Sequence, residues 1–203
     1  MNLRIPQTAL LEIDLQKDFC PGGSLAVAEG DAVLGPLNTL AGKFAQEGGR
    51  VIATADWHPA DHVSFQTLWP VHCVQGTGGA AFHEGLDLRP VNLILHKGFR
   101  RELDSYSAFF ENDRTTATGL DGFLRSLGIG TVALGGLATD YCVLYSAMDA
   151  VRLGYTTIVL RDAVRGVGQP AGSVEAAFKQ MEAAGVIILN SAELLCVALC
   201  VAL

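Results

Sequence analysis

The chain has 203 residues, half of which are hydrophobic, and a formal net charge of -7. This length suits one domain with a sizeable core. The acidic balance argues against nucleic acid and anionic membranes as partners, because both attract basic surfaces. We therefore expect a small-molecule ligand, and the apolar content leaves room for a homo-oligomer interface. An odd number of cysteines and an N-terminus without an apolar leader predict a reducing, cytoplasmic location.

Short apolar runs alternate with segments of helical period along the chain. The runs predict strands at 9–13, 51–55, 91–95, 131–134, 156–160 and 186–189, and the helical segments are 33–46, 119–127, 140–153 and 173–184. This alternation predicts a parallel sheet covered by helices on both faces. Ligands of such sheets bind beyond the carboxyl ends of the strands, so the residues after each run are the candidates for a site.

The first predicted strand, 9–13, contains Glu12, and Asp14 stands at its carboxyl end. A carboxylate at this strand end could take a proton from a thiol or pass one to a leaving group. It could equally cap the loop through hydrogen bonds to nearby N–H groups. Asp18, further along, is interpreted as a loop residue. Glu12 stands where a buried parallel strand prefers an apolar side chain, and the sequence offers no reason for it.

The residues after the second predicted strand could hold a metal ion. Asp56 and His58 are two apart in an extended chain, so both side chains project to one side. His62 and His72 offer further imidazoles. One carboxylate with two or three imidazoles suits zinc, with iron and manganese as alternatives. The same residues are also compatible with a polar loop whose histidines are solvated.

Lys97 follows the third predicted strand. A buried ammonium group at this place could stabilise a thiolate or a developing oxyanion. The more common state of such a lysine is an exposed side chain lying over apolar neighbours. The loop from 103 to 110 mixes polar and aromatic residues, among them Tyr106, and would suit the lining of a pocket.

After the fourth predicted strand, Gly135-Gly136 predicts a tight turn that leads into a helix. Thr139 or Asp140 could cap this helix, which would place Cys142 in its first turn. Unpaired N–H groups and the helix dipole stabilise a thiolate there, so the position suits a nucleophile. The alternative is a small buried apolar side chain, the usual state of a free cysteine.

Five ordered motifs together resemble the nicotinamidases, also called pyrazinamidases, of the isochorismatase-like cysteine hydrolases. They are Asp14-Leu-Gln-Lys-Asp-Phe-Cys-Pro-Gly-Gly, Asp56-Trp-His-Pro-Ala-Asp-His-Val-Ser-Phe, Trp69-Pro-Val-His-Cys-Val, Lys97-Gly and Gly136-Leu-Ala-Thr-Asp-Tyr-Cys-Val. The resemblance spans residues 9–194 and implies a three-layer α/β/α fold with a six-stranded parallel sheet. It implies one hydrolase domain over 1–203. The apolar tail 194–203 is not explained by it and would be a terminal packing segment or an unstructured tail.

The resemblance also implies a catalytic triad and a metal site. The triad would be Cys142, Lys97 and Asp14. A divalent metal, zinc before iron or manganese, would be held by Asp56, His58 and His72, with His62 as a further candidate. The implied reaction is hydrolysis of nicotinamide to nicotinate and ammonia in NAD salvage, with pyrazinamide as a further candidate substrate.

In the implied mechanism, Asp14 removes the thiol proton, Cys142 attacks the carboxamide carbon, and Asp14 protonates the departing ammonia. Water then releases nicotinate from the thioester. The backbone N–H groups of Ala138 and Cys142 would hold the oxyanion, and in the family the peptide bond before the matching alanine is cis. The metal would take the pyridine nitrogen, while the ring would lie between the aromatic residues Phe19, Trp69 and Tyr106.

Three other interpretations stay open at this point. The protein could be a related hydrolase acting on another small amide or on an isochorismatase-type ether. It could be a redox-active protein in which Cys142 pairs with Cys20 or Cys73 as a resolving thiol. It could also be a metal-binding module without catalysis, in which case replacing Cys142 would leave its function intact.

Overall fold

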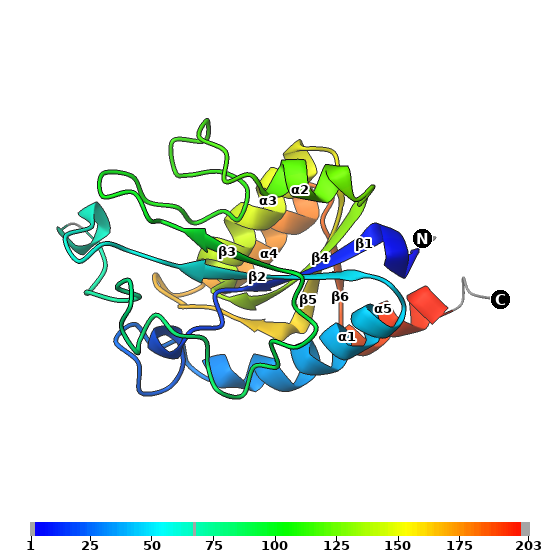
Figure 1. Cartoon of the computed structure of the whole chain (residues 1–203), viewed down its shortest axis with the longest axis horizontal. Coiled ribbons are helices and arrows are strands. Elements are labelled where there is room, and N and C mark those ends of the chain that lie inside the picture. The colour runs from blue at the N-terminus through cyan, green and yellow to red at the C-terminus, as the bar shows by residue number, and fades with distance from the viewer. Residues whose placement is uncertain (1–2, 67, 200–203) are drawn as a thin grey trace.

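The computed structural model describes residues 3–66 and 68–199. One sheet of six parallel strands has the order β3-β2-β1-β4-β5-β6 (Figure 1). The strands are β1 (Thr8–Ile13), β2 (Arg50–Asp56), β3 (Leu93–Lys97), β4 (Thr131–Leu137), β5 (Thr156–Arg165) and β6 (Ile187–Leu189). The predicted class, a parallel α/β fold with six strands, is confirmed.

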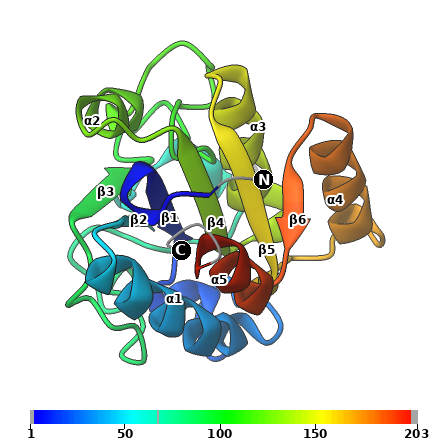
Figure 2. The same cartoon turned by 90° about the vertical axis from the view of Figure 1, so that its right-hand side faces the viewer.

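Helices cover both faces of this sheet (Figures 1 and 2). On one face lie α1 (Leu34–Gln46) and α5 (Ser191–Leu199), and on the other lie α2 (Leu120–Ser126), α3 (Leu144–Arg152) and α4 (Ser173–Ala183). All six residues of β1 are buried. Burial on both faces explains why the central strands are continuous apolar runs and do not alternate with polar residues. Among the described residues, no helix combines the length and apolarity needed to span a membrane.

The third and fourth strands differ from the prediction. β3 begins two residues later than expected, and its last residue is Lys97. Gly135 and Gly136 do not form a turn, because both belong to β4, where the pairing with β5 shifts its register. Gly136 has φ +121° and passes so close to Ile13 that a Cβ atom would lie 2.1 Å from the Ile13 carbonyl oxygen. Only glycine allows this approach, and β4 therefore continues past the predicted turn.

The structure also shows the conformation of the C-terminal tail and the surroundings of Glu12. The tail packs as helix α5, in which Leu194 is fully buried; residues 200–203 lie outside the described part. Glu12 is fully buried on β1, and neither of its carboxylate oxygens has a hydrogen-bond partner within residues 3–66 and 68–199. It occupies the same face of the strand as Leu10, which belongs to the core beneath α1.

Candidate active site

The site lies at the carboxyl ends of four neighbouring strands. Asp14 follows β1, Asp56 and Lys97 end β2 and β3, and Cys142 follows β4. Because the strand order is β3-β2-β1-β4, these four ends lie side by side on one edge of the sheet. Residues far apart in the sequence therefore meet without any local motif joining them.

Lys97 is the centre of this group and is fully buried. Its Nζ atom lies 2.8 Å from Oδ2 of Asp14 and 3.5 Å from Sγ of Cys142, and it also donates to the carboxylate of Asp56. A fourth contact goes to the backbone oxygen of Ser105 at 3.0 Å. The ammonium group thus contacts both carboxylates and the thiol.

The side chain of Asp14 is held from the neighbouring strand. Thr54 of β2 donates its hydroxyl to Oδ1 of Asp14 at 2.6 Å. Asp14 itself has φ 52°, in the left-handed region, so the chain turns away from the sheet directly at this residue. The free carboxylate oxygen is thereby aimed at Lys97, and the carboxylate and thiol atoms of Asp14 and Cys142 lie within 4.8 Å of each other.

Burial dominates the protonation of these groups. It raises the pKa of the Cys142 thiol well above its ordinary value and raises the pKa of Asp14, and the charge of Lys97 offsets only part of either effect. For Lys97, burial opposes the charge, but the two carboxylates outweigh it and the pKa lies well above its ordinary value. Burial also opposes the charge of Asp56, yet Lys97 and His58 lower its pKa.

The expectation that the start of a helix stabilises the Cys142 thiolate is therefore wrong. Residues Thr139–Val143 form a π-helical turn before α3, and its N-cap, Ala138, makes no side-chain capping bond. The thiol is buried, so desolvation of the anion outweighs the helix dipole. The carboxylate of Asp14 lies beside this thiol.

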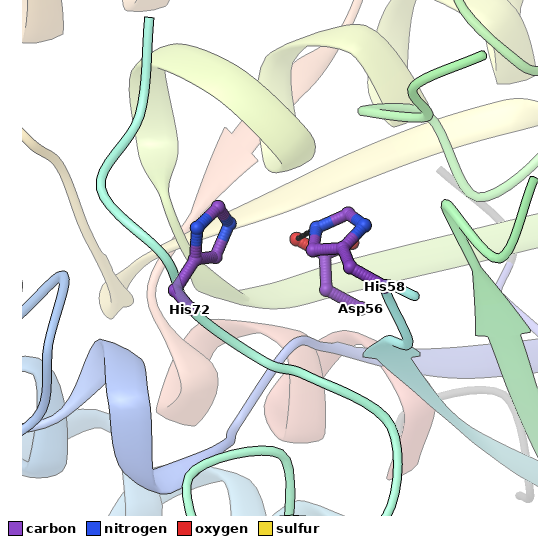
Figure 3. A group of neighbouring side chains, drawn as sticks. All are labelled: Asp56, His58 and His72. Carbon is purple, nitrogen blue, oxygen red and sulfur yellow. Dashed lines mark ion pairs between the residues drawn. The ribbon is translucent and has the colours of Figure 1, made fainter. Parts of the chain in front are cut away.

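Three predicted metal ligands converge beside this group. One ligand atom from each of Asp56, His58 and His72 lies within 4.8 Å of the others, and all three side chains are buried. Figure 3 shows His72 facing the Asp56–His58 pair across an open space. His58 and His72 each donate from Nδ1 to a backbone oxygen, of Gly98 at 2.8 Å and of Pro70 at 2.7 Å.

These hydrogen bonds determine the chemistry of the three-residue set. A carbonyl oxygen can only accept, so both Nδ1 atoms carry a proton, and in the neutral form of each ring Nε2 presents a lone pair. Nε2 of His58 lies 3.6 Å from Oδ2 of Asp56. Two neutral imidazoles oriented through Nδ1, together with one ionised carboxylate, are a donor set that fits a divalent transition metal with positions left open.

His62 has different surroundings. Its ring stacks on His58 with 4.2 Å between the centroids, and its Nδ1 atom lies 2.7 Å from the Ser64 hydroxyl. Its ligand atoms group with those of His58 and Asp104, and the three-residue set above does not include it. Burial and the neighbouring His58 lower the pKa of His62. The imidazole of His62 thus stacks against one metal-ligand candidate, His58, but its ligand atoms do not group with those of Asp56 and His72.

A pocket lined largely by aromatic and apolar side chains contains the thiol and the three-residue set in its wall. All four predicted substrate-binding residues line it. Those four are Phe19, Trp69, Tyr106 and Ala138. Trp69 donates from Nε1 to the hydroxyl of Tyr106 at 3.1 Å. The peptide bond between Leu137 and Ala138 is cis, as expected from the family resemblance. The other lining residues are Leu25, Val27, Asp56, His58, His72, Asp104, Tyr141, Cys142 and Val167.

Several residues of the site were missed by the sequence analysis. Tyr141 contacts Trp69 and Tyr106 edge to face, with centroid distances of 4.9 and 5.6 Å, and its position directly before Cys142 was the available signal. Asp140 does not cap a helix. Its carboxylate accepts from the backbone N–H groups of Val167 and Gly168 at 2.9 Å, which ties a pocket wall to the nucleophile's turn.

Comparisons with known proteins agree with this architecture. The model of the isochorismatase domain matches residues 8–193. The nicotinamidase of Acinetobacter baylyi is 41% identical, over 96% of this chain and 99% of its own. The pyrazinamidase of Pyrococcus horikoshii, solved in complex with zinc, is 38% identical with a TM-score of 0.83 and covers 91% of this chain and 99% of its own.

A third relative has been solved with a small molecule. The PnC1 protein of L. infantum, in complex with nicotinate, is 38% identical with a TM-score of 0.88. The match covers 95% of this chain and 96% of that one. The family match over most of the chain, the identity to these relatives and the shared fold lead to one conclusion. The chain belongs to the isochorismatase family, among its nicotinamidases and pyrazinamidases.

Proposed function

We propose that this protein hydrolyses nicotinamide to nicotinate and ammonia, as an amidase of NAD salvage. The observation that carries the proposal is that Cys142 lines an aromatic pocket, with Lys97 and Asp14 buried beside it. A flat heteroaromatic ring bound in this pocket would lie against Phe19, Trp69 and Tyr106, with its carboxamide near the thiol. The A. baylyi relative, named as a nicotinamidase, and the nicotinate-bound L. infantum relative support this substrate.

In the first half of the reaction, Asp14 takes the proton of the Cys142 thiol as the sulfur attacks the carboxamide carbon. Asp14 then passes that proton to the departing nitrogen, so ammonia leaves and a thioester forms. The buried ammonium group of Lys97 holds Asp14 in place and stabilises the sulfur as it becomes negative. Backbone N–H groups of Ala138 and Cys142 receive the oxyanion.

In the second half, Asp14 deprotonates a water molecule that attacks the thioester carbon. The carbon–sulfur bond breaks, the thiol recovers its proton, and nicotinate leaves. A divalent metal, proposed as zinc with iron and manganese as alternatives, would be held by Asp56, His58 and His72, with His62 as a further candidate. When bound, it supplies a Lewis-acidic contact for the ring nitrogen, and the zinc-bound relative from P. horikoshii supports the choice of metal.

We further infer that residues 1–203 act as one hydrolase domain, because one sheet brings Asp14, Asp56, Lys97 and Cys142 together at the same edge. A cytoplasmic location is part of the same proposal. The cysteines of the described chain, Cys20, Cys73, Cys142 and Cys196, are all free thiols. Such thiols are typical of reducing compartments.

The test is ammonia release from nicotinamide and from pyrazinamide by the purified protein. Cys142→Ala should abolish turnover, whereas Cys196→Ala, at an exposed cysteine in α5, should leave it unchanged. Removal of the metal should lower turnover, and zinc should restore it. Failure of the metal-replete wild type to release ammonia from either amide would refute the substrate, and full activity of Cys142→Ala would refute the nucleophile.

A further inference from the structure

The backbone of Asp56 loses its strand partner just where the metal-ligand candidates begin. β1 pairs with β2 up to Glu12 and Ala53, and the left-handed conformation of Asp14 then turns the chain away. On its other edge, Asp56 still pairs with Lys97 of β3. The N–H and C=O groups of Asp56 that face β1 would remain buried and unpaired without a substitute, at a considerable cost.

The side chain of Gln16 is that substitute. Its Nε2 atom donates to the backbone oxygen of Asp56 at 2.8 Å, and its Oε1 atom accepts from the backbone N–H of Asp56 at 2.8 Å. Nε2 also donates to the backbone oxygen of Ala80 at 2.8 Å. Gln16 is fully buried. One amide side chain thus reproduces the two hydrogen bonds of a neighbouring strand and joins Asp56 to the loop that follows His72.

Asp18, two residues later, holds the other side of the three-residue set. Its Oδ2 atom accepts from the backbone N–H of Cys73 at 2.7 Å, directly after His72. Cys73 has φ 45°, a conformation that a non-glycine residue rarely adopts. Gly79 passes so close to the Asp18 carboxylate that a Cβ atom would lie 2.2 Å from it. The segment that follows His72 therefore contacts the Asp18 carboxylate at two points, Cys73 and Gly79.

We propose that Gln16 and Asp18 are positioning residues that set the distance between Asp56 and His72 and thereby the affinity for a divalent metal. Neither side chain belongs to the three-residue set itself. Each acts through the backbone of a ligand or of its neighbour. This inference rests on the proposed function, since it requires that Asp56, His58 and His72 bind a metal. Partners of this kind typically change metal affinity by about 10- to 100-fold.

The test measures zinc binding to the metal-free full-length protein by competition with a chelator. Gln16→Glu keeps the shape of the side chain but replaces the donating nitrogen with an acceptor facing two carbonyl oxygens. Gln46→Glu is the control, because it makes the same change at the exposed end of α1, before the amino end of β2. We expect the zinc Kd of Gln16→Glu to rise at least tenfold and that of Gln46→Glu to stay within twofold of wild type.

A second readout separates positioning from general destabilisation. The visible absorption of Co²⁺ bound to the same site reports the ligand geometry, and we expect it to change in Gln16→Glu and not in Gln46→Glu. Asp18→Ala, in the short 3-10 helix Lys17–Phe19, provides a second variant should Gln16→Glu not fold, and its zinc Kd should also rise at least tenfold. Folding of each metal-free variant is checked by circular dichroism.

The outcomes distinguish this inference from the proposed function. If the wild type binds neither zinc nor cobalt, both the metal site and the positioning roles are refuted. If the wild type binds zinc, but folded Gln16→Glu or Asp18→Ala binds it within twofold with an unchanged cobalt spectrum, only the positioning roles are refuted. The inference is supported if these variants show a raised zinc Kd and a changed cobalt spectrum, while the control shows neither change.

Discussion

Replacing Glu12 with glutamine should make the protein more stable above neutral pH. The Glu12 carboxyl is fully buried in β1 without a hydrogen-bond partner, and this burial, with a smaller contribution from Asp87, raises its pKa from 4.5 to about 8. The folded state therefore keeps the proton over a pH range in which the unfolded state has lost it. Glutamine has the same shape and stays neutral at every pH.

The size of the effect follows from the two pKa values. Below pH 4.5 the carboxyl is protonated in both states, so its ionisation contributes nothing to stability. Between pH 4.5 and about 8 the folded state binds more protons than the unfolded state, and the free energy of unfolding falls as the pH rises. Each pH unit is worth about 1.4 kcal/mol. The total loss is on the order of 5 kcal/mol at pH 8 and above, and about 3 kcal/mol is already lost at pH 7.

The assay is urea unfolding of both proteins at several pH values from 5 to 9. The difference between their free energies of unfolding should widen in favour of Glu12→Gln as the pH rises, because the other titrating groups are common to both proteins. Glu47→Gln, at an exposed position, is the control and should show no such trend. Parallel curves for wild type and Glu12→Gln over the whole range would refute the reasoning.

Three other predictions concern the site. Asp14→Asn should lower kcat for ammonia release by about 10²- to 10⁴-fold through loss of the acid–base group, and a kcat near that of wild type would exclude this role. Trp69→Ala should raise KM for nicotinamide by about two- to tenfold with kcat nearly unchanged, since ring stacking is worth about 0.5–1.5 kcal/mol; an unaltered KM would remove Trp69 from the pocket's function. Lys97→Met should lower the free energy of unfolding by about 3–5 kcal/mol in urea, because Asp14 and Asp56 would stay buried without their cation. Equal stability would contradict the buried pairing.

The layout of the site could be predicted from the sequence because it follows from chain order and strand ends. Asp14, Asp56, Lys97 and Cys142 each lie at or just beyond an apolar run, and a parallel sheet brings such positions to one edge. The side chains of the proposed chemistry could therefore be identified from the sequence as ionisable or nucleophilic residues at predicted strand ends. The family resemblance added their roles.

What the sequence did not reveal depends on contacts between distant segments. The Gly135-Gly136 pair has the local signature of a turn, and only the approach of Ile13 makes it part of a strand. Gln16 bonds to a backbone 40 residues away, and no periodicity records such a contact. The thiolate expectation failed for the same reason, because it considered the start of the helix alone and not the burial of Cys142 by the surrounding chain.

The order of strands in the sheet has a consequence for the nascent chain. As the polypeptide leaves the ribosome, β1, β2 and β3 emerge first and can form half of the sheet, with the carboxylates, imidazoles and lysine of the site already aligned. One edge of β1 then stays open, since its partner β4 is completed only at Leu137. An apolar edge of this kind can pair with other chains. The late arrival of β4 closes that edge, and Cys142 follows β4 in the chain, so the thiol joins the other residues of the site in the same step that covers the open edge.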